Sequence, residues 1–179
     1  MQARPSHTLL HRFFAGLAES TFQARLGVVD PPLIDYIADL LVRFVRSDAV
    51  YRLRDLRGRP IREVAEMLVE AEARVGDPRR EAHRHVGDFT LFWTGVYPEA
   101  VSRMRSTMKK DHLLDYLAQG KRAYLLASTI ETDDENDAPA ELLERLSDRF
   151  EMCAYGLREV RREWEHHSED DMPRPFLIN

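Results

Sequence analysis

The chain has 179 residues and a net charge of −5, and 44% of its residues are hydrophobic and 32% charged. This balance is typical of a soluble globular domain and excludes an intrinsically disordered chain, while the lack of any apolar run near 20 residues predicts that no segment spans a membrane. The single cysteine, Cys153, excludes an internal disulfide and predicts a cytoplasmic location, and the negative net charge argues against a general attraction to nucleic acid.

Helix signals begin near the start of the sequence. Ser6 is a suitable N-cap for a first helix, since apolar residues recur at helical spacing over residues 9–17. Asp30 and Asp77 are each followed by proline, a pair that is typical of a helix N-terminus. We therefore expect one helix after Asp30, with an apolar stripe over residues 33–45, and another helix after Asp77.

Between these two helices lies an arginine-rich segment. Residues 50–61, VYRLRDLRGRPI, alternate too poorly for a core helix and contain a glycine and a proline, so we expect a loop or a short hairpin. Residues 43–62 carry seven arginines and only two aspartates. We expect these arginines to be solvated and to pair with two acidic segments, 131–137 and 163–171. A contact with phosphate groups or nucleic acid is the alternative.

The helical pattern continues through the second half of the chain, apart from the acidic segment 131–137, which we expect to be a linker. Helices are expected over residues 61–76, 77–95, 98–104 and 111–130. The last helix carries apolar residues spaced alternately by three and four positions, which predicts one continuous helix of roughly 28 residues, about 40 Å long. This apolar seam consists of Leu143, Leu146, Phe150, Cys153, Leu157, Val160 and Trp164.

These elements predict an all-α fold. We expect a single-domain helical bundle over residues 1–179, with about six to seven helices and a long C-terminal core helix. Residues 168–179 are expected to form an extended tail. The apolar seam fits the core of one chain, and it also fits half of a dimer interface.

The sequence EAHRHVGDFTLFWTGVYPEA, residues 81–100, places polar residues within an aromatic-rich helix. His85, Asp88 and Phe92 follow helical spacing, so they share one helix face. A buried carboxylate needs a hydrogen-bonding or ionic partner, and an imidazole or an arginine fits that role. We therefore interpret His85 and Asp88 as a structural polar node, with Gly87 allowing another helix to approach closely.

The same residues also fit a small-molecule or catalytic pocket. In this interpretation His85 acts as an acid or a base, and Asp88 orients it. Aromatic side chains would form the walls of the pocket. The candidates for the walls are Phe92, Trp93, Tyr97, Tyr116 and Tyr124.

Metal and cofactor motifs are weak. The candidate metal ligands are His83, His85 and Asp88, which would need further ligands from other helices. The chain contains one Glu-x-x-His motif, whereas a di-iron site in a helical bundle needs two. The acidic segment 131–137 lacks the glycine of a calcium-binding loop, and glycine-rich phosphate-binding motifs are absent. We therefore expect no metal and no other cofactor.

Residues 84–99 resemble a group of uncharacterised bacterial proteins that share the motif basic-His-Ile/Val-Gly-Asp-x-x-Leu-Phe-x-x-Gly-x-x-Pro-Glu. The likeness extends from about residue 9 to Trp164, and it implies a bacterial, all-helical protein without an assigned activity. The apolar seam, the separated charges and the missing catalytic motifs predict a non-enzymatic protein that works through a protein partner or through self-association as a homo-oligomer.

Overall fold

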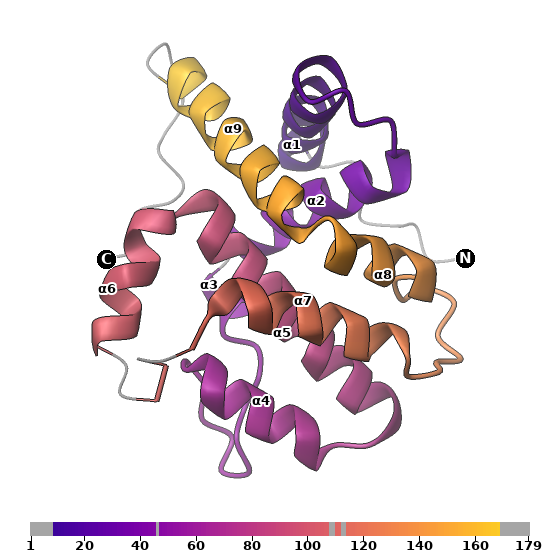
Figure 1. Cartoon of the computed structure of the whole chain (residues 1–179), viewed down its shortest axis with the longest axis vertical. Coiled ribbons are helices and arrows are strands. Elements are labelled where there is room, and N and C mark those ends of the chain that lie inside the picture. Colours follow the sequence, from indigo (N-terminus) through magenta and orange to yellow (C-terminus); the bar gives the residue numbers. More distant parts are fainter. Residues whose placement is uncertain (1–8, 46, 108–109, 112–113, 169–179) are drawn as a thin grey trace.

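The computed structural model describes residues 9–45, 47–107, 110–111 and 114–168. Within these ranges the chain folds into α-helices and one π-helix, without a β-strand (Figure 1), and no helix there is long and apolar enough to cross a lipid bilayer. The prediction of an all-α, single-domain helical bundle is confirmed. The elements are α1 (Leu9–Glu19), η1 (Ser20–Arg25), α2 (Pro31–Phe44), α3 (Ser47–Val50), α4 (Val64–Ala73), α5 (Gly76–Val96), α6 (Pro98–Thr107), α7 (Tyr116–Ser128), α8 (Ala140–Asp148) and α9 (Phe150–Ser168).

Helix α5 lies at the centre of this bundle. It contacts α2, α4, α6, α7 and α9, and most of its residues from Arg80 to Val96 are buried. A helix that is apolar on nearly all sides must be covered on all of them, which explains why α5 has so many neighbours. The aromatic-rich part of the sequence therefore forms the middle of the core.

Gly87 lets α7 pack closely against α5. A Cβ atom built on Gly87 would lie 2.7 Å from the ring of Tyr124. Any larger residue would push α7 away from α5, because packed protein interiors have no room for such an overlap. The expected close approach of a second helix at Gly87 is confirmed.

The predicted C-terminal helix is divided into α8 and α9, which meet at Arg149. The backbone of Arg149 has φ −107° and ψ 24°, away from helical values. Ser147 donates a hydrogen bond to the carbonyl oxygen of Lys121 at 2.8 Å, so the end of α8 is held against α7, whereas α9 packs against α5 and α1. The residues of the apolar seam are all buried. The expectation of one continuous helix is wrong, because its two halves pack against different neighbours.

The start of α2 follows the sequence signal. The side chain of Asp30 accepts a hydrogen bond from the backbone amide of Leu33 at 3.3 Å, as an N-cap does. The expected cap at Ser6 lies outside the described residues. So does the expected C-terminal tail, except for Ser168, which is the last residue of α9.

Candidate functional site

Asp88 forms the centre of a buried polar cluster. Its side chain is 1% exposed and accepts three hydrogen bonds from two other helices. The Oδ1 atom of Asp88 accepts hydrogen bonds from the hydroxyl groups of Tyr36 and Tyr124 at 2.6 and 2.8 Å. The Oδ2 atom accepts one from the guanidinium of Arg43 at 2.8 Å. We call these four residues the Asp88 node. It joins α2, α5 and α7 at one point.

The Asp88 node holds a fixed pattern of charge. Burial alone would raise the pKa of Asp88, but Arg43 and Arg84 outweigh burial and hold this pKa below its usual value. Burial and the neighbouring carboxylate raise the pKa values of Tyr36 and Tyr124 far above the usual value for tyrosine. Asp88 is therefore ionised and both tyrosines are protonated at neutral pH, so none of these groups is close to exchanging a proton.

His85 is buried beside the Asp88 node, but its hydrogen bond goes elsewhere. Its side chain is 2% exposed, and Nε2 lies 3.1 Å from the carbonyl oxygen of Val50, so Nε2 carries the proton. Nδ1 is buried without a hydrogen-bond partner. Burial lowers the pKa of His85 to about 4, which keeps the ring neutral at neutral pH. The expected orientation of His85 by Asp88 is wrong, since the three hydrogen bonds of the carboxylate go to Tyr36, Tyr124 and Arg43.

The aromatic candidates are divided between two regions. Near the C-terminal end of α5, three rings pack edge-to-face or tilted against one another, those of Phe92, Trp93 and Tyr97, and the guanidinium of Arg161 lies 4.7 Å from the centre of the Tyr97 ring. Tyr124 belongs to the Asp88 node. The structure therefore does not bring these side chains together as the walls of one pocket.

Tyr116 lies at a second buried carboxylate, which the sequence did not indicate. Asp111 is fully buried and accepts a hydrogen bond from the Tyr116 hydroxyl at 2.6 Å. The same carboxylate accepts hydrogen bonds from the backbone amides of Val64 and Ala65, each at 2.8 Å. Asp111 therefore caps the start of α4 from a distant part of the chain, which is a structural role.

The metal candidates do not converge. His83 is fully buried, and its Nε2 lies 3.6 Å from a carboxylate oxygen of Glu72 across the contact between α4 and α5. Burial lowers the pKa of His83, so the ring is neutral at neutral pH. His85 and Asp88 have the separate partners given above. In the described part of the chain, no three His, Cys, Asp or Glu side chains are arranged to hold a metal ion.

The loop between α3 and α4 is a short hairpin, as expected. The backbone amide of Ile61 donates a hydrogen bond to the carbonyl oxygen of Leu53 at 2.9 Å. The backbone amide of Asp55 donates one to the carbonyl oxygen of Arg59 at 3.0 Å. The side chains of Leu53 and Ile61 are buried, so both arms are anchored in the core. We call residues 53–61 the basic hairpin. It protrudes beside α4 at the lower end of the molecule in Figure 1.

The tip of the basic hairpin is apolar and is flanked by positive charge. Leu56 is 98% exposed, and Arg54, Arg57 and Arg59 are exposed around it. Arg59 pairs with Asp55 at 2.8 Å, and Arg54 donates to a carbonyl oxygen of the hairpin itself at 3.0 Å. Arg57 has no ion pair within the described ranges. The tip thus presents a leucine with unneutralised positive charge beside it.

The acidic segment 131–137 is held by α5. The buried guanidinium of Arg80 binds the carboxylate of Asp137 at 2.7 Å and three backbone carbonyl oxygens around the segment, and Arg84 binds the same carboxylate. The expectation that the arginine-rich segment pairs with the acidic segment 131–137 is wrong, because α5 supplies closer arginines. Arg43 binds instead to Asp88, Arg52 to Glu81 and Arg59 to Asp55. In the second acidic segment, Glu163 pairs with Arg25 and Glu165 pairs with Arg161, while residues 169–171 lie outside the described residues.

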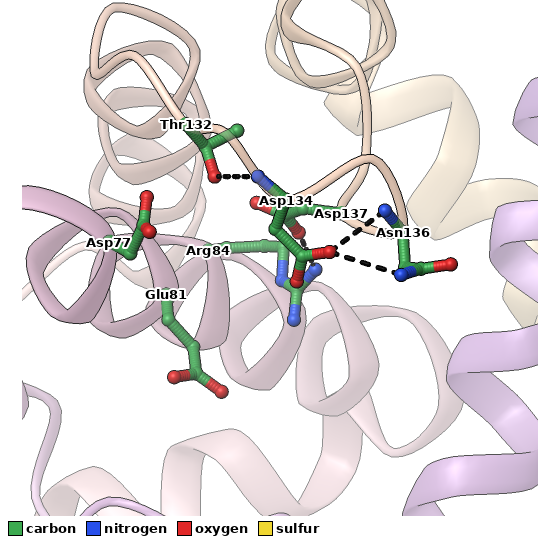
Figure 2. A pocket seen from close by; sticks show the side chains of 7 residues that line it. All are labelled: Asp77, Glu81, Arg84, Thr132, Asp134, Asn136 and Asp137. Carbon is green, nitrogen blue, oxygen red and sulfur yellow. Dashed lines mark hydrogen bonds and ion pairs between the residues drawn. The ribbon is translucent and has the colours of Figure 1, made fainter.

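A polar hollow lies between the start of α5 and the acidic segment (Figure 2). Its volume is about 200 Å³, which compares with about 30 Å³ for one water molecule in the liquid. Asp77 and Glu81 project from α5 on one side, and Arg84 extends between them and the residues of the loop. We call this the acidic hollow. It is lined by Asp77, Glu81, Arg84, Thr132, Asp134, Asn136 and Asp137.

Comparisons with protein-family models, with curated proteins and with solved structures give no match. The resemblance of residues 84–99 to a bacterial group therefore stays a prediction.

Proposed function

We propose that this chain is a non-enzymatic helical protein that works by binding another protein chain through the basic hairpin. The observation that carries the proposal is the tip of the hairpin, where Leu56 is 98% exposed between arginines. Arginine is enriched in protein interfaces and lysine is depleted there, and the fully buried centre of an interface is more apolar than the rest of the surface. A single exposed leucine is ordinary on a protein surface, and it is the place of Leu56 on a fixed tip beside positive charge that favours a contact with another molecule.

The basic hairpin is fixed before it meets a partner. Backbone hydrogen bonds join its two arms, and the carboxylate of Asp55 accepts hydrogen bonds from the amides of Arg57 and Arg59 at 2.8 and 2.9 Å. Gly58, with φ +76°, allows the tight turn. A preformed hairpin loses little conformational freedom on binding, which favours a recognition role.

The candidate catalytic residues and the cysteine are enclosed by the protein. His85 and Asp88 are almost completely buried, and the acidic hollow is lined by other residues. Cys153 is also buried, and burial raises the pKa of its thiol to about 12, so its reactive thiolate form is scarce at neutral pH. These observations favour the structural interpretation of His85 and Asp88 over a catalytic pocket.

A protein partner fits the basic hairpin better than nucleic acid does. Binding to single-stranded nucleic acid uses aromatic rings as stacking platforms next to positive charge. Tyr51 is the aromatic residue beside the hairpin, and the guanidinium of Arg62 covers its ring at 5.3 Å. We include a cytoplasmic location in a bacterial cell in this proposal, on the basis of the single buried cysteine and the resemblance of residues 84–99.

Site-specific photo-crosslinking in the cells that naturally make the protein tests the proposal. A photo-reactive amino acid replaces Leu56 in one variant and Tyr155 in a control variant, because Tyr155 is half-exposed on α9. We expect crosslinked species from position 56 and not from position 155. If position 56 yields none, the proposed function is wrong.

Native mass spectrometry of the untagged protein, purified without chelator, tests the alternative pocket. A tightly retained small molecule that is lost in the His85→Ala variant would favour a pocket at His85 and Asp88. A chain without any retained mass, alone or as an oligomer, agrees with the binding function.

A further inference from the structure

The acidic hollow keeps a negative charge that its neighbours do not neutralise. Glu81 is paired with Arg52, and Asp137 is paired with Arg80 and with Arg84. The other two carboxylates of the hollow, Asp77 and Asp134, form no ion pair in the part of the chain that the structure describes. Both are exposed. The hollow can therefore accept a further cation of the size of a guanidinium group.

The basic hairpin carries a positive charge that no neighbouring carboxylate of the described ranges neutralises. The guanidinium of Arg57 is exposed at the tip and forms no ion pair among the described residues. The backbone bonds of the hairpin and the buried side chains of Leu53 and Ile61 fix the tip to the core, and Arg57 is not among the residues that line the acidic hollow of its own chain. An unpaired arginine and an unneutralised acidic hollow thus occur on the same molecule without meeting.

The two surfaces are neighbours on the chain. Arg52, at the base of the hairpin, pairs with Glu81 at the edge of the acidic hollow. Arg74 at the end of α4 donates a hydrogen bond to the carbonyl oxygen of Arg54 at 3.3 Å, which ties the hairpin to the turn between α4 and α5. In that turn Val75 is 80% exposed, two residues before Asp77. The hairpin therefore contacts both the turn that carries Val75 and the edge of the acidic hollow.

We infer that the basic hairpin binds the acidic hollow of a second copy of this chain, so that two copies form a symmetric pair. Arg57 of each copy enters the acidic hollow of the other beside Asp77, and Leu56 of each copy lies against Val75 of the other. Positive charge then meets negative charge and apolar surface meets apolar surface. Because each copy carries both a hairpin and a hollow, a two-fold axis produces two identical contacts and closes the assembly at two copies. The inference rests on the proposed function and names its partner.

Charge reversal at each side of the contact gives a direct test. The Arg57→Glu variant and the Asp77→Arg variant each break no ion pair within the described residues, so both are expected to fold. In each variant alone, the two contacts of a symmetric pair become repulsive. An exposed ion pair contributes up to about fivefold in affinity, so losing two raises the Kd by roughly 30-fold. Sedimentation equilibrium over a range of protein concentrations measures that Kd.

Mixing the two variants restores both contacts. The glutamate introduced at position 57 of the first variant would face the arginine introduced at position 77 of the second, and the unchanged Arg57 of the second variant would face the unchanged Asp77 of the first. We expect a one-to-one pair in the mixture, with a Kd close to that of the wild-type dimer. Arg158→Glu is the matched control, since Arg158 is exposed on α9 and its substitution changes the net charge by the same amount as Arg57→Glu. It should leave the dimer unchanged.

The outcomes separate this inference from the proposed function. A wild-type dimer that dissociates in each single variant and re-forms in the mixture supports the inference. A wild-type chain that stays monomeric, or variants that dimerise like the wild type, would overturn it. Leu56→Ser adds a variant without a change of charge, and it must also weaken the dimer. If the chain is monomeric but position 56 crosslinks to a different protein in cells, the proposed function stands and the inference fails.

Discussion

Replacing the Asp88 carboxylate with an amide tests whether the Asp88 node holds three helices together. The Asp88→Asn variant keeps the shape of the side chain and one oxygen that can accept from Tyr36 and Tyr124. It removes the charge that binds Arg43, and it places an amide NH2 donor where the guanidinium also donates. We expect a folded but clearly less stable protein.

The structure sets the size of the effect. Breaking a buried ion pair by removing one partner costs about 3 to 5 kcal/mol, because the remaining charge is left without compensation. The side chain of Arg43 is 32% exposed, so water can partly solvate its guanidinium after the change. This places the expected loss near the lower end, at about 3 kcal/mol. Such a loss corresponds to a decrease in Tm of roughly 10 °C for a chain of this size.

Urea denaturation followed by circular dichroism measures this loss as a change in the free energy of unfolding. Asp35→Asn is the control, because Asp35 is exposed on α2 and its substitution should change this free energy by less than about 0.5 kcal/mol. Arg43→Gln in the Asp88→Asn background should cost much less than the same change in the wild type, since the two residues are directly coupled. A loss below about 1 kcal/mol in Asp88→Asn, or additive effects in the double variant, would refute the reasoning.

Three further predictions follow from burial. The pKa of His85 is about 4 in the folded protein and 6.5 in the unfolded chain. The contribution of His85 to the free energy of unfolding is therefore fully present above about pH 7 and is lost as the pH falls toward 4. This amounts to about 3 kcal/mol in total, and unfolding measured at pH 7 and pH 5 should show a smaller difference in His85→Gln than in the wild type. Gly156→Ala should destabilise the protein by about 2 kcal/mol, since its Cβ would lie 2.2 Å from the ring of Phe22. Gly16→Ala should stabilise it by about 0.5 to 1 kcal/mol, because Gly16 lies on α1 with open space around it. Thermal melting in which both variants shift the Tm in the same direction would contradict this. Cys153 should not react with iodoacetamide at pH 8 until urea unfolds the chain, which mass spectrometry detects as an added mass, and fast labelling of the folded protein would show that the thiol is accessible.

The sequence predicted the helices better than it predicted where they bend. The start of α2 follows from an aspartate and a proline, which act through contacts a few residues apart. The break at Arg149 has no such local signal, since neither proline nor glycine lies there. It accompanies the hydrogen bond from Ser147 to the carbonyl oxygen of Lys121, 26 residues earlier in the chain. Sequence periodicity cannot reveal a contact over that separation.

The sequence predicted that a buried carboxylate on α5 has a partner, but it did not predict which residues from other helices bind it. The spacing of α5 residues indicated that Asp88 is buried and needs a partner such as an arginine, and Arg43 has that role. Which arginine becomes the partner depends on how α2 crosses α5, because Arg43 and Asp88 are 45 residues apart in the sequence. Tyr116 and Tyr124 illustrate the same limit. Both lie on α7, but eight residues correspond to about 12 Å along a helix, so they serve different carboxylates.

Two arginines from the same basic stretch show why composition alone could not assign it one role. Arg43 follows Tyr36 by seven residues on α2, so both side chains lie on the face that covers α5, and the arginine compensates a buried charge. Arg57 lies at the tip of a hairpin, where the turn leaves it exposed and without an ion pair in the described part of the chain. An arginine that is already bound inside the fold contributes to stability, and one that the fold leaves unpaired is available to a partner. Which of the two roles an arginine has depends on whether its element packs against a buried carboxylate or projects into water. Arg43 therefore acts in the core at one end of the arginine-rich segment, whereas Arg57 acts at the surface.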